Sequence, residues 1–208
     1  MRKRGSFVLL LLGAALLCAA LLLAAKNRRE ETSAGEAAAA LLVQAEQTIA
    51  QHTASPVSSP PAAPDAAAAE ETLSPSPSAS PSAAPEGPAF LGVLSVPAVS
   101  LTVPVLAEWS YYHLTLAPCR DCGSVETGDL VIAAHNYDTH FGRLSRIAPG
   151  DSVYFTDMAG STTEYAAASV EQRDPSDAEG VRGSGYPLVL YTCSWDCTAR
   201  VTVFCGYA

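Results

Sequence analysis

The sequence predicts a mainly β domain, a small barrel or sandwich, behind an apolar N-terminal helix and a proline-rich connecting segment. Three features point to this arrangement. An uncharged apolar run occupies residues 7–25, nine of the fifteen prolines fall within residues 53–88, and short strand-like runs fill residues 89–208. A chain of 208 residues has room for one domain of this size together with such appendages.

Residues 1–31 are expected to form a membrane anchor. The run from Phe7 to Ala25 spans about 28 Å as a helix, close to the roughly 30 Å hydrocarbon core of a bilayer. A cleavable signal peptide is the alternative, although its apolar region is usually only about 7–15 residues long. Basic residues flank both ends of the run, so charge alone leaves the orientation open. The exported character of the remaining chain favours a single-pass protein with an extracellular domain.

Residues 32–88 are expected to connect the anchor to the domain. The alanine-rich segment 33–52 predicts a juxtamembrane helix, solvated and partly frayed. Residues 53–88 are rich in Pro, Ser and Ala and have too little apolar surface to offset their ordering entropy, so we expect disorder. A proline-rich chain is extended, and both a spacer across a cell-wall layer and a generic linker fit it.

Residues 89–208 are expected to form the folded unit. Seven short runs in it are rich in Val, Leu, Tyr and Thr and are bounded by Gly, Pro, Asp or Ser, which is typical of β-strands. They cover residues 90–97, 101–109, 128–136, 151–158, 163–172, 186–194 and 199–207. Only residues 139–147 predict a short helical turn. Many short strands at this spacing favour a barrel or sandwich.

The net charge argues against one class of partner. The chain carries a formal charge of −9 and has a pI near 4.8. A nucleic-acid-binding protein normally presents a basic face to the phosphates. We therefore expect no nucleic-acid partner.

A hairpin near the C-terminus brings a cysteine and an arginine together. If Asp196 and Cys197 form its tip, Cys193 lies opposite Arg200 on one face, and Cys205 lies on the more apolar core face. A nearby guanidinium favours the reactive thiolate. It can also donate hydrogen bonds to an oxyanion that develops on a carbonyl substrate.

A nucleophilic cysteine also needs an acid–base partner, which is normally histidine. Among the four histidines, His135 ends the buried-looking run "GDLVIAAHN". A side chain at a strand end is held in place, which suits catalysis. A structural role is the competing interpretation of this feature alone.

These pieces together resemble the sortases, membrane-anchored cysteine transpeptidases of bacterial cell surfaces. The resemblance rests on "VLYTC" ending at Cys193, "AAHN" containing His135, "RVTV" beginning at Arg200, and "HFGRLSRIAPGDSVYFTD" after His135. It covers about the last 120 residues. It implies a closed eight-stranded β-barrel with short helices, with Cys193 as nucleophile, His135 as general acid/base and Arg200 as oxyanion stabiliser.

The resemblance also implies a reaction and its partners. Cys193 would cleave the sorting signal at the C-terminus of a surface protein and form a thioester, and an amine of a cell-wall precursor or a pilin would resolve it. Attack by water would give hydrolysis. No cofactor or metal is implied. Ala134 replaces the family's usual glycine, and the loop between Cys193 and Arg200 is short, which leaves substrate and subclass open.

The remaining cysteines keep another interpretation open. Cys119 and Cys122 have C-x-x-C spacing, and with Cys193 and Cys197 they offer four ligands for zinc, although the second pair has one residue too many for the commonest form. Disulfides are also compatible with an extracellular domain. The alternative function is therefore a non-catalytic, membrane-anchored β-domain with structural cysteines.

Overall fold

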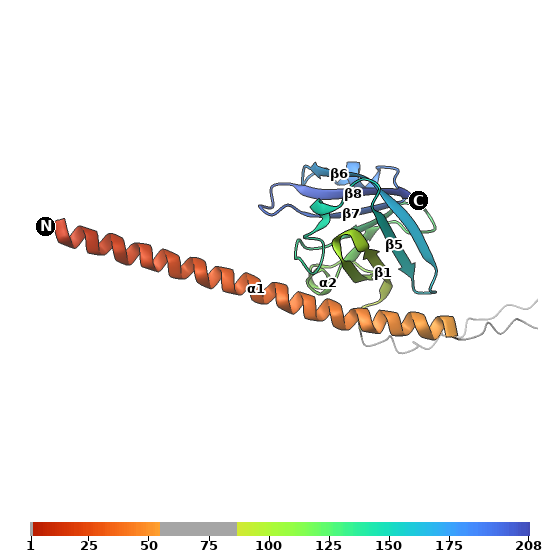
Figure 1. The fold of residues 1–208 in the computed structure, drawn as a ribbon, viewed down its shortest axis with the longest axis horizontal. Coiled ribbons are helices and arrows are strands. Elements are labelled where there is room, and N and C mark those ends of the chain that lie inside the picture. Colours follow the sequence, from red (N-terminus) through yellow and green to blue (C-terminus); the bar gives the residue numbers. More distant parts are fainter. Residues whose placement is uncertain (1, 55–86) are drawn as a thin grey trace, which may run out of the picture.

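The computed structural model describes residues 2–54 and 87–208, and Figure 1 shows a long helix lying beside a β-domain. The helices are α1 (Arg2–Ala54), η1 (Pro97–Val99), α2 (Tyr111–Leu116), η2 (Leu144–Arg146) and α3 (Ala178–Arg182). The strands are β1 (Phe90–Val96), β2 (Leu101–Leu106), β3 (Cys119–Cys122), β4 (Leu130–Ala133), β5 (Ser152–Asp157), β6 (Thr162–Arg173), β7 (Leu188–Cys193) and β8 (Arg200–Tyr207).

The eight strands form a closed barrel in the order β1-β2-β3-β4-β7-β8-β6-β5. The pairs β2/β3 and β4/β7 are parallel, and the other neighbours are antiparallel. Closure leaves no unpaired sheet edge. The predicted closed eight-stranded barrel is confirmed, and the sandwich alternative is excluded.

Strand β7 shows why the apolar runs of the sequence form buried strands. Leu188 and Leu190 point into the main core of the barrel, whereas Val189 packs outside the barrel with Val131 and with Val181 of α3. Both faces of β7 are therefore covered, which explains a run without polar alternation. Cys205 is fully buried in the main core, as its predicted face requires.

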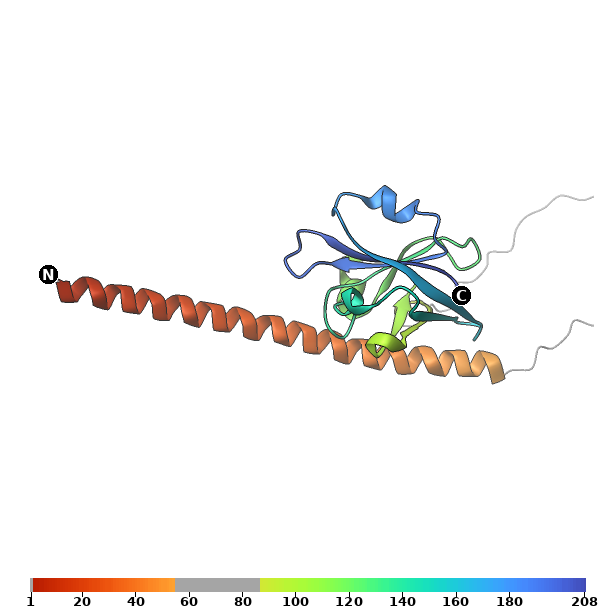
Figure 2. The same cartoon turned by 45° about the horizontal axis from the view of Figure 1, so that its top comes forward.

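Helix α1 packs against the barrel along one narrow stripe. The stripe consists of Ala34, Ala38, Leu41 and Ala45, which are buried and follow a helical spacing of four, three and four residues. Small alanine side chains let the helix axis approach the barrel closely. Figure 2 shows α1 still beside the barrel after the molecule is turned. The helix predicted at 33–52 is confirmed, but its expected solvated and frayed character is wrong, because one face of this segment is buried.

Leu41 anchors this stripe in a second apolar cluster on the barrel. Its partners come from β2, α2, β3 and β4, and they are Leu106, Leu114, Ala117, Cys119 and Ala133. Because β4 leads into the segment that carries His135, α1 and this segment belong to the same packed region.

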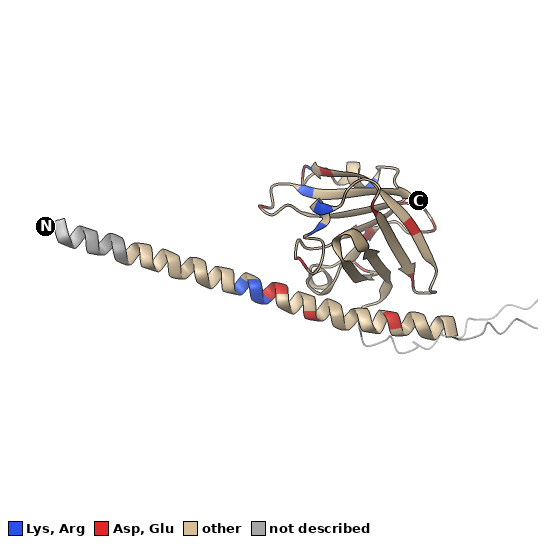
Figure 3. Cartoon of the chain, viewed as in Figure 1, with Lys and Arg blue, Asp and Glu red and all other residues tan. Residues whose placement is uncertain are grey.

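The N-terminal part of α1 extends past the barrel (Figure 1). Residues 11–30 are exposed, and the helix contains a stretch long and apolar enough to cross a membrane, a test that a signal sequence also passes. Figure 3 shows a short basic stretch on α1, immediately followed by acidic residues. These are Lys26, Arg28 and Arg29, followed by Glu30 and Glu31. The predicted disordered stalk lies outside the described residues, apart from its two ends.

Candidate active site

Cys193 and Arg200 are directly paired across neighbouring strands. Cys193 is the last residue of β7, Arg200 is the first residue of β8, and the antiparallel register places them opposite each other. Opposite residues in such a pair have Cβ atoms about 4.5–5.5 Å apart on the same face. The predicted pairing of these two residues is confirmed.

His135 follows β4, the strand that pairs with the other side of β7. Strands β4 and β7 are parallel, and Ala133 pairs with Tyr191. His135 lies two residues beyond Ala133, and Cys193 lies two residues beyond Tyr191. Neighbouring strands are about 4.7–4.9 Å apart, so this parallel register directs the segments that carry His135 and Cys193 to the same end of the barrel.

Three hydrogen bonds fix the two strand ends around these residues. The backbone N–H of Ala134 donates to the carbonyl of Tyr191 at 3.2 Å, and the Thr192 hydroxyl donates to the carbonyl of Ala134 at 2.8 Å. The side-chain amide of Asn136 donates to the carbonyl of Ser194 at 3.2 Å. The chain is therefore held on both sides of His135 and of Cys193.

A small pocket lies beside the cysteine. Its volume is about 110 Å³, and its walls come from residues 136–145, the end of β7, the β7–β8 loop and the start of β8, with neither His135 nor Arg200 among the lining residues. Cys193 is a free, exposed thiol at this pocket, so the sulfur is neither sealed in the core nor bonded to another cysteine. Trp195, on the same loop, is 95% exposed and forms part of the pocket wall.

The sequence of the barrel matches the model of one protein family. The family model for the sortase domain matches residues 94–207, which is more than half of the chain. The chain belongs to the sortase family. That family consists of cysteine transpeptidases. No curated protein matches the chain.

Solved structures of sortases share the fold of this sortase. They include sortase C1 of Streptococcus agalactiae, at 18% identity and a TM-score of 0.50, with 57% of this chain and 69% of the other covered. Sortase C of Streptococcus pneumoniae has 20% identity and a TM-score of 0.50, covering 57% and 66%. Sortase A of Corynebacterium diphtheriae has 18% identity and a TM-score of 0.50, covering 59% and 62%. Both C-type and A-type sortases are therefore similar to this chain, and the subclass stays open.

Burial controls the ionisation of the two groups in the site of this sortase. Burial raises the pKa of the Cys193 thiol, the neighbouring Cys197 raises it further, and the charge of Arg200 lowers it only in part. Burial lowers the pKa of His135. Both shifts favour the neutral thiol and the neutral imidazole near pH 7. Arg200 lowers the thiol pKa, as the sequence predicted, but by less than burial and Cys197 raise it.

Arg200 keeps its hydrogen-bonding capacity available. Its guanidinium lies 4.9 Å from the centre of the Tyr191 ring, a cation–π contact that holds the side chain over the sheet. Within residues 11–54 and 87–208, no carboxylate forms an ion pair with it. Its partner in the register, Arg173, differs, because Glu171 and Asp177 neutralise that guanidinium.

The other cysteines do not assemble a metal site in the parts of the chain that the structure describes. Cys119 is buried in β3, where burial raises its pKa to about 12, and Cys122 is half-buried on the same strand. Cys197 is an exposed, free thiol on the β7–β8 loop. No group of three or more His, Cys, Asp or Glu side chains suited to a metal occurs in these parts.

Two features near the site were missed by the sequence reasoning. Tyr137 lies between two histidines, with its ring tilted against both and its centre 5.0 Å from that of His135 and 5.6 Å from that of His140. His140 is fully buried, although the sequence suggested only that it begins a helical turn. The rings of His135, Tyr137 and His140 fall within six residues of the sequence, and this clustering could have indicated that they pack together.

Proposed function

We propose that this sortase is a cysteine transpeptidase in which Cys193 is the nucleophile, His135 the general acid/base and Arg200 the oxyanion stabiliser. The observation that carries the proposal is the position of an exposed thiol at the end of β7, flanked by His135 beyond β4 and by Arg200 on β8. The pairings β4/β7 and β7/β8 support a common site for the three residues, because they direct the segments carrying them to the same end of the barrel. A non-catalytic β-domain gives no reason for this convergence.

The first half of the reaction follows from these neutral groups. The thiol sulfur attacks the carbonyl carbon of the scissile peptide while its proton passes to the imidazole of His135. The carbonyl oxygen gains negative charge, and the guanidinium of Arg200 donates hydrogen bonds to it. When the carbon–nitrogen bond breaks, the imidazolium returns the proton to the leaving amine, and a thioester remains on Cys193.

The second half reverses these roles. An incoming amine loses a proton to His135 and attacks the thioester carbon. A new carbon–nitrogen bond forms, the carbon–sulfur bond breaks, and the proton returns to the thiolate of Cys193. Water in place of the amine gives hydrolysis.

The substrates we propose are surface proteins that carry a C-terminal sorting signal, with an amine of a cell-wall precursor or a pilin as the acceptor. The solved sortase C of Streptococcus pneumoniae is described as a protein with pilin substrate specificity. The apolar part of α1 supports a membrane anchor, and we propose that the barrel lies on the outer side of the membrane, where surface proteins are found.

The test is capture of the thioester. Incubation of the wild-type chain with a library of sorting-signal peptides, without an amine, is expected to give an acyl-enzyme mass on Cys193. Cys193→Ala is expected to give none, and turnover to fall to background. Cys197→Ala, which removes an exposed thiol four residues away, should still form the adduct. Unchanged turnover in Cys193→Ala would rule out the mechanism.

A further inference from the structure

We propose that helix α1 is a working part of the catalytic domain, because its segment 31–38 holds the loop that carries His135 and thereby positions this side chain toward Cys193. The proposal rests on the proposed catalytic role of His135. The loop in question, residues 134–143, connects β4 to η2, and it is here called the histidine loop. In this view Glu31 and Gly35 are positioning residues, distant along the chain from the site.

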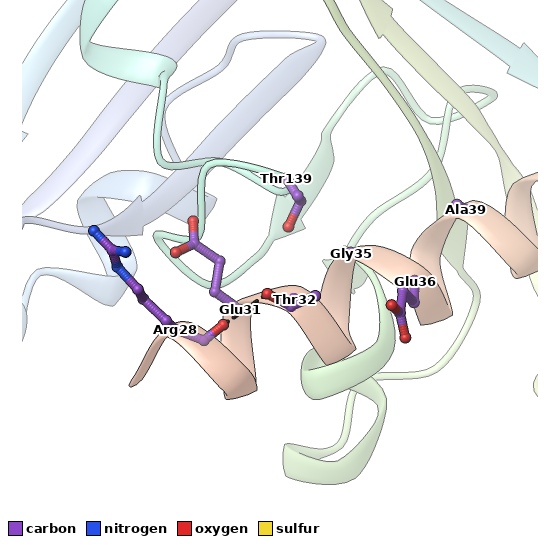
Figure 4. Close-up of a pocket in the computed structure, with 7 residues that line it drawn as sticks. All are labelled: Arg28, Glu31, Thr32, Gly35, Glu36, Ala39 and Thr139. Atoms are coloured by element: carbon purple, nitrogen blue, oxygen red, sulfur yellow. Dashed lines mark hydrogen bonds between the residues drawn. The ribbon is translucent and has the colours of Figure 1, made fainter. Parts of the chain in front are cut away.

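A hydrogen bond connects α1 to the backbone of the histidine loop. The backbone N–H of Asp138 donates to Oε1 of Glu31 at 3.0 Å, between residues 107 positions apart. Figure 4 shows the carboxylate of Glu31 pointing away from α1 toward the loop that bears Thr139. This bond satisfies a loop N–H three residues after His135 with a partner outside the barrel.

Helix α1 and the histidine loop also approach each other closely, which restricts their relative position. A Cβ atom at Gly35 would lie only 2.8 Å from Cγ2 of Thr139, a distance that real Cβ contacts do not reach. The neighbouring Ala34 is buried at 4% exposure. Figure 4 shows Thr139 directly over this part of the helix. The absence of a side chain at Gly35 therefore sets how closely the histidine loop can lie on α1.

The contact is transmitted to His135 through side-chain packing. The rings of His140, Tyr137 and His135 follow one another at centre distances of 5.6 and 5.0 Å. Burial raises the pKa of Tyr137, and the charges of Glu30 and Glu31 raise it further. A displacement of the histidine loop from α1 would therefore move the Tyr137 ring, which lies next to His135.

The same helix provides a matched pair of glycines for the experiment. Gly13 also lies within α1, but a Cβ there has no atom within 4 Å, whereas one at Gly35 meets Thr139. We suggest the full-length chain in lipid nanodiscs, with Gly35→Leu as the variant and Gly13→Leu as the control. Transpeptidation of a soluble sorting peptide would be followed together with hydrogen exchange of residues 134–143.

For Gly35→Leu we expect faster exchange in the histidine loop and a fall in kcat of at least about tenfold, because a misplaced catalytic group costs rate. The KM for the peptide and the rate of Cys193 alkylation should stay within about twofold, since the pocket at Cys193 does not include α1. Gly13→Leu should match the wild type in all four measurements. A split between kcat and KM separates positioning from general loss of structure.

A second set of variants tests the hydrogen bond without steric change. Glu31→Ala is expected to lower kcat, Glu31→Gln to restore part of it because its amide oxygen still accepts, and Glu36→Ala on the exposed side of α1 to have no effect. The proposal is overturned if Gly35→Leu and Glu31→Ala both keep kcat within twofold of the wild type. Loss of the thioester only in Cys193→Ala would then still support the proposed function, so the two failures are distinguishable.

Discussion

At the residue scale, the ionisation of Cys193 depends on two opposing influences. Arg200 favours the thiolate, but partial burial and the nearby Cys197 thiol outweigh it, so the pKa of Cys193 lies above its ordinary value of 9.0. His135 is shifted in the opposite direction, because burial lowers its pKa. Proton transfer from sulfur to imidazole is therefore uphill in the free enzyme and needs the charge stabilisation that Arg200 can offer to the developing oxyanion.

This balance predicts how Cys193 reacts with iodoacetamide. The alkylation rate should rise with pH and reach half of its maximum above pH 9.0, because the thiolate is the reacting form and the pKa is raised. Cys197→Ala should move this midpoint to lower pH, since one cause of the raised pKa is removed. Mass spectrometry of the Cys193 peptide measures both profiles. An identical midpoint in the two proteins would contradict the assigned influence of Cys197.

Arg200 gives a prediction about geometry rather than charge. Arg200→Lys should lower kcat by roughly 100-fold, because a lysine keeps the charge but not the planar set of donors, nor the stacking on Tyr191. Arg173→Lys, the partner of Arg200 in the register, is the matched control and should stay within a fewfold of the wild type. Steady-state transpeptidation measures both. Near-normal rates in Arg200→Lys would leave Arg200 with a packing role.

The sequence pattern alone predicted where Arg200 lies relative to Cys193, but it did not predict where His135 lies. The pairing of Cys193 with Arg200 follows from the period of two in a hairpin with a short tip. The approach of His135 does not, because it depends on the parallel pairing of β4 with β7, two strands separated by more than fifty residues. The placement of His135 at the same end of the barrel as Cys193 could be expected only from the resemblance to the sortases.

At the element scale, the seven runs predicted as strands are strands, and β3 was missed. Its four residues, "CRDC", include two charged residues and lack β-branched side chains, so local propensity does not favour a strand there. Its position is fixed by pairing with β2 and β4. Docking of α1 was missed for a related reason. Three of the four residues in its buried stripe are alanines, which indicate a helix but hardly indicate a contact.

His140 lies fully buried where α1, α2 and the histidine loop meet. Burial lowers its pKa from 6.5 to about 4, and the nearby His135 contributes. The carbonyls of Ala34 and Leu116 approach the ring and oppose this lowering in part, although neither ring nitrogen meets hydrogen-bond geometry within the described residues. Protonation of His140 therefore works against the folded state, in which the ring is buried.

This predicts a loss of stability in acid. Between pH 6.5 and about 4 the unfolded chain binds a proton at residue 140 that the folded chain excludes, so the free energy of unfolding falls by about 3 kcal/mol as the pH is lowered through this window. His140→Phe should remove this part of the pH dependence. Urea unfolding at pH 7 and pH 4.5 compares the two proteins. Equal losses in both would show that His140 is not responsible.

At the scale of the whole molecule, the barrel and the N-terminal half were predicted on different grounds. The barrel follows from strand patterns and is shared with other sortases, whose structures cover 57–59% of this chain in the cases described. The apolar part of α1 follows from composition alone. Their mutual arrangement was not predictable, because α1 continues without interruption across the predicted boundary at residue 31 and uses its far half as part of the packed domain.

Because α1 is uninterrupted, it also fixes the distance between its apolar run and the segment that contacts the histidine loop. If residues 7–25 cross a bilayer, Glu31 and Gly35 stand only about 9–15 Å beyond the apolar run, at 1.5 Å per residue. The β7–β8 loop points toward the N-terminal half of α1 in both views (Figures 1 and 2). The end of the barrel that carries this loop would then face the lipid at a short distance. A polypeptide still embedded in the same leaflet could offer its bond for cleavage only within a few residues of where it emerges.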